Sequence, residues 1–335
     1  MRPIFVGGCE RSGTTLLGAM LGAHSSCLCV PEMKFKLDIL QLCSASDHDE
    51  GKKGASLQKL VSPSKFRIWE LGADLTALPL EQMSGRDLVE WAVTAYGQKV
   101  GKPAPSIWID HTPSNIKYAW TLFHVFPDAH LVHIIRDGRA VAASLLPLDW
   151  GPNEIDHTVR YWTERLAYGF VAELRWPEKV TRIHYEDLVR DPKAALRKLC
   201  AVLAIPYEPA MCQGTGFQVP KYTAKQHALV GSPPNSARAN AWEQQLTPRQ
   251  IEIFESLAGD LLVSLGYPAK FGLHAKRMSR LEKILSRVRE FYKKEFGNRR
   301  RNRRKKEAIP ARLREPPLSQ THACLLLILS YSQLI

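Results

Sequence analysis

Short apolar runs followed by helical stretches are the main pattern over the first two thirds of the chain. Four of these runs have the length of buried strands and lie at residues 4–6, 106–110, 129–135 and 180–185. The first is followed by a polar loop and then by apolar residues at 16–21, as in a strand, a turn and a helix. Strands that alternate with helices form βαβ units, whose strands lie parallel in one sheet. The pattern therefore predicts an α/β fold with a central parallel sheet.

The pattern changes in the last third of the chain. Residues 214–240 are rich in Gly, Pro, Ser and Asn and have no periodicity, so we expect a long loop. Thr247 and Pro248 predict the start of a helix, because threonine caps helix N-termini and proline suits the first helical position. Farther on, apolar residues recur at helical spacing with basic residues between them: Leu281, Ile284, Leu285, Val288, Phe291 and Tyr292. We therefore expect one domain at 1–275 and a C-terminal extension at 276–335 that is partly helical and partly disordered.

The positive charge of the chain is concentrated in this C-terminal extension. The 335 residues include 46 Lys/Arg and 33 Asp/Glu, a formal net charge of +13. Residues 276–315 alone contain 17 Lys/Arg and 5 Asp/Glu, so the remainder is close to neutral. A basic amphipathic helix binds an anionic membrane or an acidic polymer, or it remains a solvated extension. The sequence leaves these three alternatives open, and we expect no nucleic acid as a partner.

The cysteines and the apolar segments of the chain indicate the cellular compartment in which the protein is expected. The seven cysteines are irregularly spaced and too few for a disulfide framework in a chain of this length, so we expect free thiols. The apolar core of a secretory signal, about 7–15 residues long, is not found near Met1. The apolar run at 323–329 is much shorter than the roughly 20 residues that cross a bilayer. These features predict a soluble protein of the cytoplasm, with the secretory pathway as the alternative if a further segment precedes Met1.

A phosphate-binding loop is predicted directly after the first strand. The segment from Gly8 to Thr15 has the spacing of a P-loop, with Gly8 and Gly13 at its two glycine positions. Such a loop binds phosphate because its backbone N–H groups and the N-terminus of the next helix point toward the same place. Thr14 stands where ATP- and GTP-binding loops have lysine, which argues against the transfer of a nucleotide γ-phosphate. Arg11 supplies positive charge instead, through a planar guanidinium that suits phosphate or sulfonate oxygens.

Several separated segments of the chain match the motifs of one known family. They are Pro3 to Gly8, Arg11 to Leu16, Ala19 to Leu21, Ala23-His24, Gly101 to Pro105, Arg136 to Ala140, His184 to Leu188 and Leu265 to Tyr267. In these segments the chain resembles the sulfotransferases that use 3′-phosphoadenosine 5′-phosphosulfate (PAPS), in particular the tyrosylprotein sulfotransferase branch. The resemblance spans residues 3–270. It implies a P-loop NTPase-like three-layer fold, PAPS as the donor, no metal requirement and a hydroxyl group as the acceptor.

The resemblance also implies which residues bind the donor. The 5′-phosphosulfate would lie on the loop residues Arg11, Ser12, Gly13, Thr14 and Thr15. Arg136 and Ser144 have the family's separation of eight residues and would bind the 3′-phosphate. Arg136 directly follows a predicted strand, and ligands of open α/β sheets bind beyond the carboxyl ends of the strands. Tyr185 would contact the nucleotide. An arginine that only ends a strand and a tyrosine that packs inward are the structural alternatives.

Three residues are assigned to the chemistry by the same resemblance, namely Glu32, Arg11 and His111. Glu32 corresponds to the general base of the tyrosylprotein branch, with a surface glutamate as the alternative. His111 stands where the family has a lysine near the bridging oxygen. A histidine donates a hydrogen bond there only with a suitable pKa, and a structural role is the alternative. Cys29 aligns with a cysteine that is disulfide-bonded in the secretory enzymes, whereas Ile109 stands at the position of its partner.

Together these residues predict a sulfotransferase that moves a sulfonate group from PAPS to a hydroxyl by in-line displacement. A protein tyrosine, a carbohydrate and a small molecule all remain open as acceptors. One alternative is a P-loop kinase, which Thr14 and the pair of Arg136 and Ser144 disfavour. The other is a non-catalytic protein that binds polyanions through its basic extension.

Overall fold

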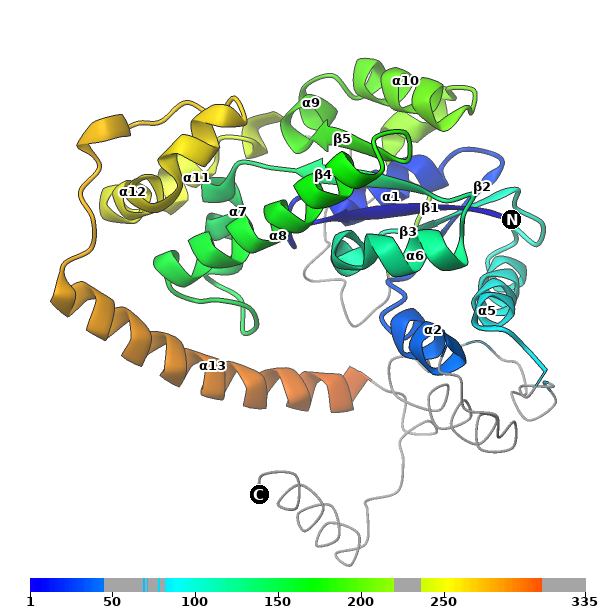
Figure 1. The fold of residues 1–335 in the computed structure, drawn as a ribbon, viewed down its shortest axis with the longest axis horizontal. Helices are drawn as coiled ribbons and strands as arrows, with labels where there is room; N and C mark the ends of the chain where they lie inside the picture. Colours follow the sequence, from blue (N-terminus) through cyan, green and yellow to red (C-terminus); the bar gives the residue numbers. More distant parts are fainter. Residues whose placement is uncertain (45–68, 70, 72–77, 79–81, 220–235, 309–335) are drawn as a thin grey trace, which may run out of the picture.

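The computed structural model describes residues 1–44, 69, 71, 78, 82–219 and 236–308, and Figure 1 shows their arrangement. The strands are β1 (Arg2–Gly8), β2 (Cys27–Val30), β3 (Ile107–Asp110), β4 (His130–Ile135) and β5 (Val180–His184). The helices are α1 (Thr14–Gly22), α2 (Lys36–Ser44), α5 (Gly85–Lys99), α6 (Ala119–Val125), α7 (Gly138–Leu145), α8 (Ile155–Arg175), α9 (Tyr185–Arg190), α10 (Pro192–Leu203), α11 (Trp242–Gln245), α12 (Pro248–Ser264) and α13 (Arg280–Ala308). Short 3-10 helices are η2 (Pro113–Tyr118), η3 (Pro209–Gln213), η5 (Ser236–Arg238) and η6 (Gly272–His274).

The five described strands form one parallel sheet in the order β2-β3-β1-β4-β5. Four of them coincide with the predicted apolar runs. β2 was not predicted, because its four residues follow so closely on α1 that they read as a continuation of the apolar helix pattern. Cys29 of β2 is the direct cross-strand neighbour of Ile109 of β3, which places the two family disulfide positions side by side. Because the strands are parallel, their carboxyl ends meet along one edge of the sheet.

Helices cover both faces of the sheet and give the predicted three layers (Figure 1). Successive side chains of a strand point to opposite faces. Phe5 and Trp108 therefore face a core that includes residues of α2, α5, α6 and α8. Ile4 and Ile109 face the opposite core, to which α1, α9 and α10 contribute. The α/β architecture with a central parallel sheet is confirmed.

The C-terminal elements begin and end at residues whose types favour those boundaries. Thr247 caps α12 and forms a reciprocal capping box with Gln250, as its residue type predicts. The helix ends two residues before Gly266, which adopts a left-handed φ of 84°. Of the predicted loop at 214–240, residues 220–235 lie outside the described residues, as does the segment 309–335.

The apolar periodicity beyond residue 280 corresponds to a single helix, α13, of 29 residues. The proposed division of the chain near residue 275 stays a prediction. Within the part of the chain that the structure describes, no helix combines the length and the apolar character needed to cross a membrane.

Candidate active site

The loop between β1 and α1 has the backbone geometry of an anion-binding turn. Arg11 and Gly13 lie in the left-handed region, with φ of 72° and 99°. A Cβ atom on Gly13 would lie 2.6 Å from Cδ2 of Tyr185, so glycine is required there. No side chain caps α1, which leaves its first N–H groups to be satisfied by another partner. Ser12 is fully buried and its hydroxyl has no hydrogen-bond partner among the described residues.

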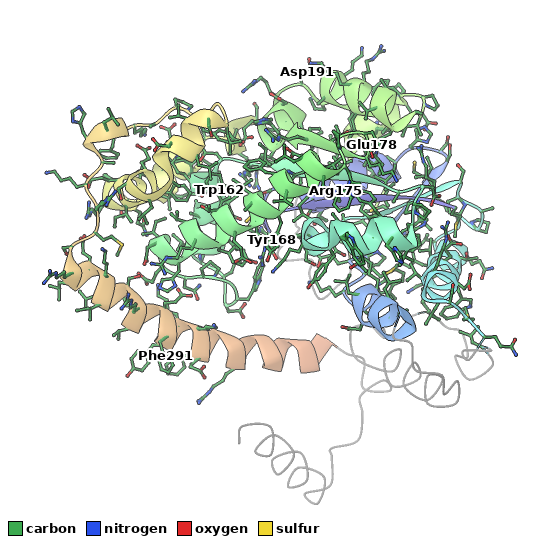
Figure 2. All side chains as sticks on the ribbon, viewed as in Figure 1. Trp162, Tyr168, Arg175, Glu178, Asp191 and Phe291 are labelled. Atoms are coloured by element: carbon green, nitrogen blue, oxygen red, sulfur yellow. The ribbon has the colours of Figure 1, made fainter. Side chains whose placement is uncertain are left out.

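The predicted second phosphate site lies directly against this loop. Arg11 Nε donates a hydrogen bond to Ser144 Oγ at 2.9 Å, and an Arg136 Nη atom donates to the Arg11 carbonyl at 2.9 Å. The Arg136 guanidinium also stacks on the ring of Tyr185, 4.2 Å from its centroid. Trp162 of α8 (Figure 2) donates to the Arg136 carbonyl at 3.2 Å and so fixes the backbone at the end of β4. The two predicted phosphate sites therefore form one continuous surface.

Two arginine side chains, those of Arg11 and Arg136, lie close together on this surface. Burial of Arg11, together with the neighbouring charge of Arg136, lowers the pKa of the Arg11 guanidinium. A lowered pKa means that the charged form of Arg11 is destabilised at this place, and a bound anion would offset that destabilisation. Arg136 Nε is buried and has no hydrogen-bond partner among the described residues. An oxyanion at this place would satisfy both the charge and the unpaired donor.

Glu32 and His111 lie at the same edge of the sheet, after β2 and β3. Glu32 is 18% exposed, and its Oε2 lies 2.5 Å from Nζ of Lys34. His111 is buried against Phe217, with ring centroids 4.7 Å apart, and neither of its ring nitrogens has a hydrogen-bond partner among the described residues. Burial lowers the pKa of His111, although the Glu32 carboxylate nearby opposes this shift. The histidine is therefore neutral at neutral pH and has one N–H available for donation.

A buried ion pair that was not predicted joins the segment after β2 to the segment after β3. Lys36 is 1% exposed, and its Nζ donates to Asp110 Oδ2 at 2.5 Å and to Asn115 Oδ1 at 2.6 Å. Thr112 accepts a hydrogen bond from the Met33 backbone at 2.9 Å. Burial acts to raise the pKa of Asp110, but the Lys36 charge and the hydrogen bonds lower it overall. The turn that carries Glu32 is thereby tied to the turn that carries His111.

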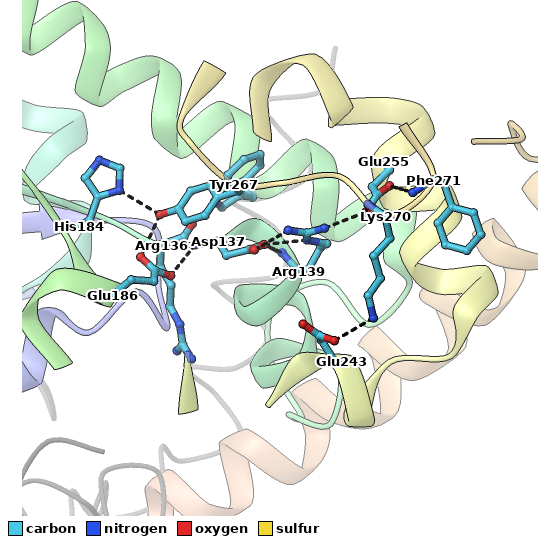
Figure 3. A network of polar contacts seen from close by, with 11 residues as sticks. Arg136, Asp137, Arg139, His184, Glu186, Glu243, Glu255, Tyr267, Lys270 and Phe271 are labelled. Carbon is cyan, nitrogen blue, oxygen red and sulfur yellow. Dashed lines mark hydrogen bonds and ion pairs between the residues drawn. The ribbon is translucent and has the colours of Figure 1, made fainter. Parts of the chain in front are cut away.

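A second polar network lies beside Arg136, at the ends of β5 and α12 (Figure 3). Glu186 accepts hydrogen bonds from the Asp137 backbone at 3.1 Å and from the Tyr267 hydroxyl at 3.0 Å. Burial raises the pKa of Glu186. Arg139 donates to both Asp137 and Glu255, at 2.7 Å each. These contacts connect three of the segments on which the family resemblance rests, those that contain Asp137, Glu186 and Tyr267.

The same network borders a cavity of about 500 Å³. Asp137, Glu186 and Tyr267 line it, but no residue of the phosphate loop does. The cavity is thus adjacent to the residues predicted to bind the donor and is not formed by them.

The structure brings the predicted site residues together from five separate segments. The phosphate loop, Arg136, Ser144 and Tyr185 meet directly, and the charge of Glu32 is close enough to act on both Arg11 and His111. Lys36 and Asn115 were missed, because no periodicity marks a polar side chain that is buried by a distant partner. Asp110 had a usable signal, since it is a carboxylate directly after a buried strand. Among the residues described, no group of three His, Cys, Asp or Glu side chains is placed to hold a metal ion.

A family description named Sulfotransferase family matches residues 3–209 of the chain. The chain belongs to this family. Protein-tyrosine sulfotransferase 1 of Danio rerio is 26% identical over 279 residues, which cover 79% of this chain and 72% of the relative. The human protein of the same name is 27% identical over 311 residues, covering 88% and 76%. The protein-tyrosine sulfotransferase of Drosophila melanogaster is 26% identical over 278 residues, and the match spans about half of its length, 51%.

Solved sulfotransferase structures have the same fold. The sulfotransferase domain of the Synechococcus PCC 7002 olefin synthase superposes with a TM-score of 0.55 at 20% identity, covering 80% of this chain and 95% of that domain. A sulfotransferase domain from the curacin biosynthetic pathway gives a TM-score of 0.51 at 19% identity, covering 79% and 97%. The predicted P-loop-like sulfotransferase fold is confirmed. Family membership also makes this chain a transferase, which removes the kinase and the non-catalytic alternatives.

Proposed function

We propose that this sulfotransferase transfers a sulfonate group from PAPS to the hydroxyl of a protein tyrosine. The observation that carries the proposal is the direct contact between the two phosphate sites, through Arg11, Ser144 and Arg136. A donor with a 5′-phosphosulfate and a 3′-phosphate needs two anion sites within one nucleotide of each other. The tyrosine acceptor is supported by the relatives, several of which are named protein-tyrosine sulfotransferases.

The described residues fit this donor on their own chemistry. The Ser12 hydroxyl and Arg136 Nε are buried donors without a partner among the residues that the structure describes, and phosphate oxygens would satisfy them. Thr14 and Thr15 are buried at the start of α1, next to its N-terminal N–H groups. The ring of Tyr185, already stacked on Arg136, adds a flat surface next to the 3′-phosphate position. Bound PAPS supplies the sulfonate group and a phosphate as leaving group.

Glu32 is the base in this proposal. As the acceptor oxygen bonds to sulfur, its proton passes to the Glu32 carboxylate, and the bond between sulfur and the bridging oxygen breaks with its electron pair on the phosphate. The Glu32 carboxylate that would take up this proton forms an ion pair with Lys34. Arg11 offsets the charge that develops on the leaving phosphate.

His111 donates a hydrogen bond in the same proposal. Its two ring nitrogens, which have no partner within the described part of the chain, lie at the edge where the donor would be bound, and its neutral form still carries one N–H. This is a weaker stabilisation than the charged lysine of the family would give. The buried pair of Lys36 and Asp110 positions His111 by fixing the turn that follows β3.

A transfer assay with sulfur-labelled PAPS tests the proposal. The acceptors are a tyrosine peptide, the same peptide with phenylalanine in place of tyrosine, a carbohydrate and a simple phenol. We expect label on the tyrosine peptide and none on the phenylalanine peptide. Glu32→Gln is expected to lower the transfer rate about 100-fold or more while 3′-phosphoadenosine 5′-phosphate (PAP) still binds. Glu178→Gln, on the exposed turn after α8, is the matched control and should transfer normally. Full activity in Glu32→Gln would remove Glu32 from the mechanism, and label on the carbohydrate alone would overturn the tyrosine acceptor.

A further inference from the structure

Helix α13 lies along one side of the molecule (Figure 1) and contacts the body through one polar face. Ser286 Oγ donates to Asp156 Oδ1 at 2.5 Å. Glu290 Oε2 accepts from the backbone N–H groups of Asn153 and Glu154 at 2.7 and 2.9 Å. These N–H groups precede α8, so Glu290 acts as a cap supplied by a different helix.

The two ends of this contact face are also fixed. Glu282 accepts two hydrogen bonds from the Arg249 guanidinium, at 2.9 and 3.0 Å. Gly297 lies so close to the body that a Cβ atom there would be 2.6 Å from the Asp149 carbonyl oxygen. Residues 282, 286, 290 and 297 lie on one face of a helix with 3.6 residues per turn. The rotation of α13 about its own axis is therefore set by the body.

The opposite face of α13 presents large apolar side chains to solvent. These residues, which we call the apolar stripe, are Leu281, Ile284, Leu285, Val288, Phe291, Tyr292 and Phe296. Each is between 42% and 66% exposed. Figure 2 shows Phe291 on the side of the helix that is turned away from the body. A continuous exposed apolar surface of this kind marks a binding surface.

The charges of α13 are divided between the two faces. Glu282 and Glu290 face the body and are bonded to it. Exposed basic residues accompany the apolar stripe: Arg280, Lys283, Arg287, Arg289, Lys294 and Arg299. Between residues 280 and 299 the one exposed acidic side chain is Glu295. The outward surface of the helix is thus apolar along its middle and positively charged along its borders.

We propose that the apolar stripe of α13 binds the surface of an anionic lipid bilayer. Its apolar side chains would enter the boundary between headgroups and acyl chains, and the bordering Lys and Arg would contact anionic headgroups. A second copy of this chain fits less well, because pairing two stripes would bring like charges together. An acidic polymer would neutralise the bases but leave seven apolar side chains in water. An anionic bilayer would both bury the apolar side chains and neutralise the basic residues. This proposal does not depend on which hydroxyl accepts the sulfonate group.

Flotation of the full chain with lipid vesicles tests this proposal. One set of vesicles is phosphatidylcholine alone, and the other contains phosphatidylserine as well. We expect binding to the anionic vesicles only, weakened by added salt. Ile284→Ser with Phe291→Ser keeps the charge and should lower the partition coefficient about tenfold or more. Arg287→Gln with Lys294→Gln keeps the apolar stripe and should also lower it about tenfold.

The control is Val171→Ser with Leu174→Ser, which removes two exposed apolar side chains from α8 and should leave binding unchanged. Circular dichroism melts of all variants check that the fold is intact. Three outcomes would overturn the proposal. They are equal binding to neutral vesicles, anionic binding that survives loss of the stripe residues, and a dimer that depends on the stripe while no vesicles are bound.

Discussion

At the scale of single residues, the proposed donor site contains polar groups that are buried and have no hydrogen-bond partner in the described part of the chain. Ser12 Oγ and Arg136 Nε have no partner among the described residues, although neighbouring groups are well bonded. Buried polar atoms are rarely left in this state, because each unpaired group costs about 1–3 kcal/mol. Arg136 also holds the Arg11 carbonyl and stacks on Tyr185, so its side chain is fixed before any ligand binds. The cost of ordering the side chain on binding is correspondingly small.

The first prediction concerns the 3′-phosphate. The protein should bind PAP about tenfold or more tightly than ADP, because a charge-assisted hydrogen bond contributes about 1.5–3 kcal/mol. Arg136→Ala should remove most of this preference in isothermal titration calorimetry. Arg160→Ala, an exposed arginine of α8, should keep it. Equal affinities of the unaltered protein for PAP and ADP would contradict the 3′-phosphate assignment.

The second prediction concerns pH. Burial, with a smaller effect of the Arg2 charge, lowers the pKa of His130 to about 4. The unfolded chain therefore takes up this proton more readily than the folded one. Stability should fall as the pH drops from about 6.5 toward 4, by the order of 2 kcal/mol for this residue after allowance for solvent screening. Urea unfolding at several pH values should show a smaller fall for His130→Gln. His274→Gln, on exposed η6, should follow the unaltered protein. An equal fall in all three proteins would assign the effect to other groups.

At the scale of elements, the strands and the phosphate loop could be predicted because apolar runs and glycine turns are local signals. β1, β3, β4 and β5 each coincide with an apolar run, and α12 begins at the predicted cap, Thr247. The pairing of Lys36 with Asp110 could not be predicted, because the partners are 74 residues apart and lysine is rarely buried. The same holds for Glu290, whose partners Asn153 and Glu154 directly precede another helix, α8. The candidate site residues could be named from family motifs and stay predictions, whereas the contacts that position them could not be predicted from the sequence.

The third prediction tests the connection between the β2–α2 and β3–η2 turns. Lys36→Met should destabilise the protein by about 3–5 kcal/mol, because it leaves the Asp110 carboxylate buried and unpaired. Lys36→Met with Asp110→Asn should recover part of this loss, since no charge remains. Arg190→Met breaks the exposed pair with Asp187 and should cost less than about 1 kcal/mol. Chemical denaturation measures all three, and a loss for Lys36→Met as small as for Arg190→Met would show that the buried pair contributes little.

At the scale of the whole molecule, the body and α13 share few apolar contacts. The core clusters of the described residues contain no side chain from α13. The helix is held by ion pairs and hydrogen bonds along its contact face. Its apolar stripe is therefore not part of the core clusters formed by the described residues.

The fourth prediction follows from this arrangement. A chain that ends at residue 275 should fold and bind PAP, but it should lose about 1–2 kcal/mol because the start of α8 loses the Glu290 cap. Glu290→Ala in the full chain should reproduce most of this loss, whereas Glu295→Ala, which is exposed, should not. Thermal melts of the three proteins provide the comparison. A truncated chain that is unfolded at room temperature would show that α13 is an essential part of the domain.

The position of α8 between two sites has a thermodynamic consequence. Its first turn is capped by Glu290 of α13, and two turns later Trp162 holds the carbonyl of Arg136. One rigid segment thus joins a proposed lipid contact to a proposed nucleotide contact. The free energy of coupling between two binding sites is reciprocal. If membrane binding raises the affinity for the nucleotide by some factor, nucleotide binding raises the affinity for the membrane by the same factor. If a membrane surface tightens nucleotide binding, the enzyme therefore stays longer on the membrane while its donor site is occupied.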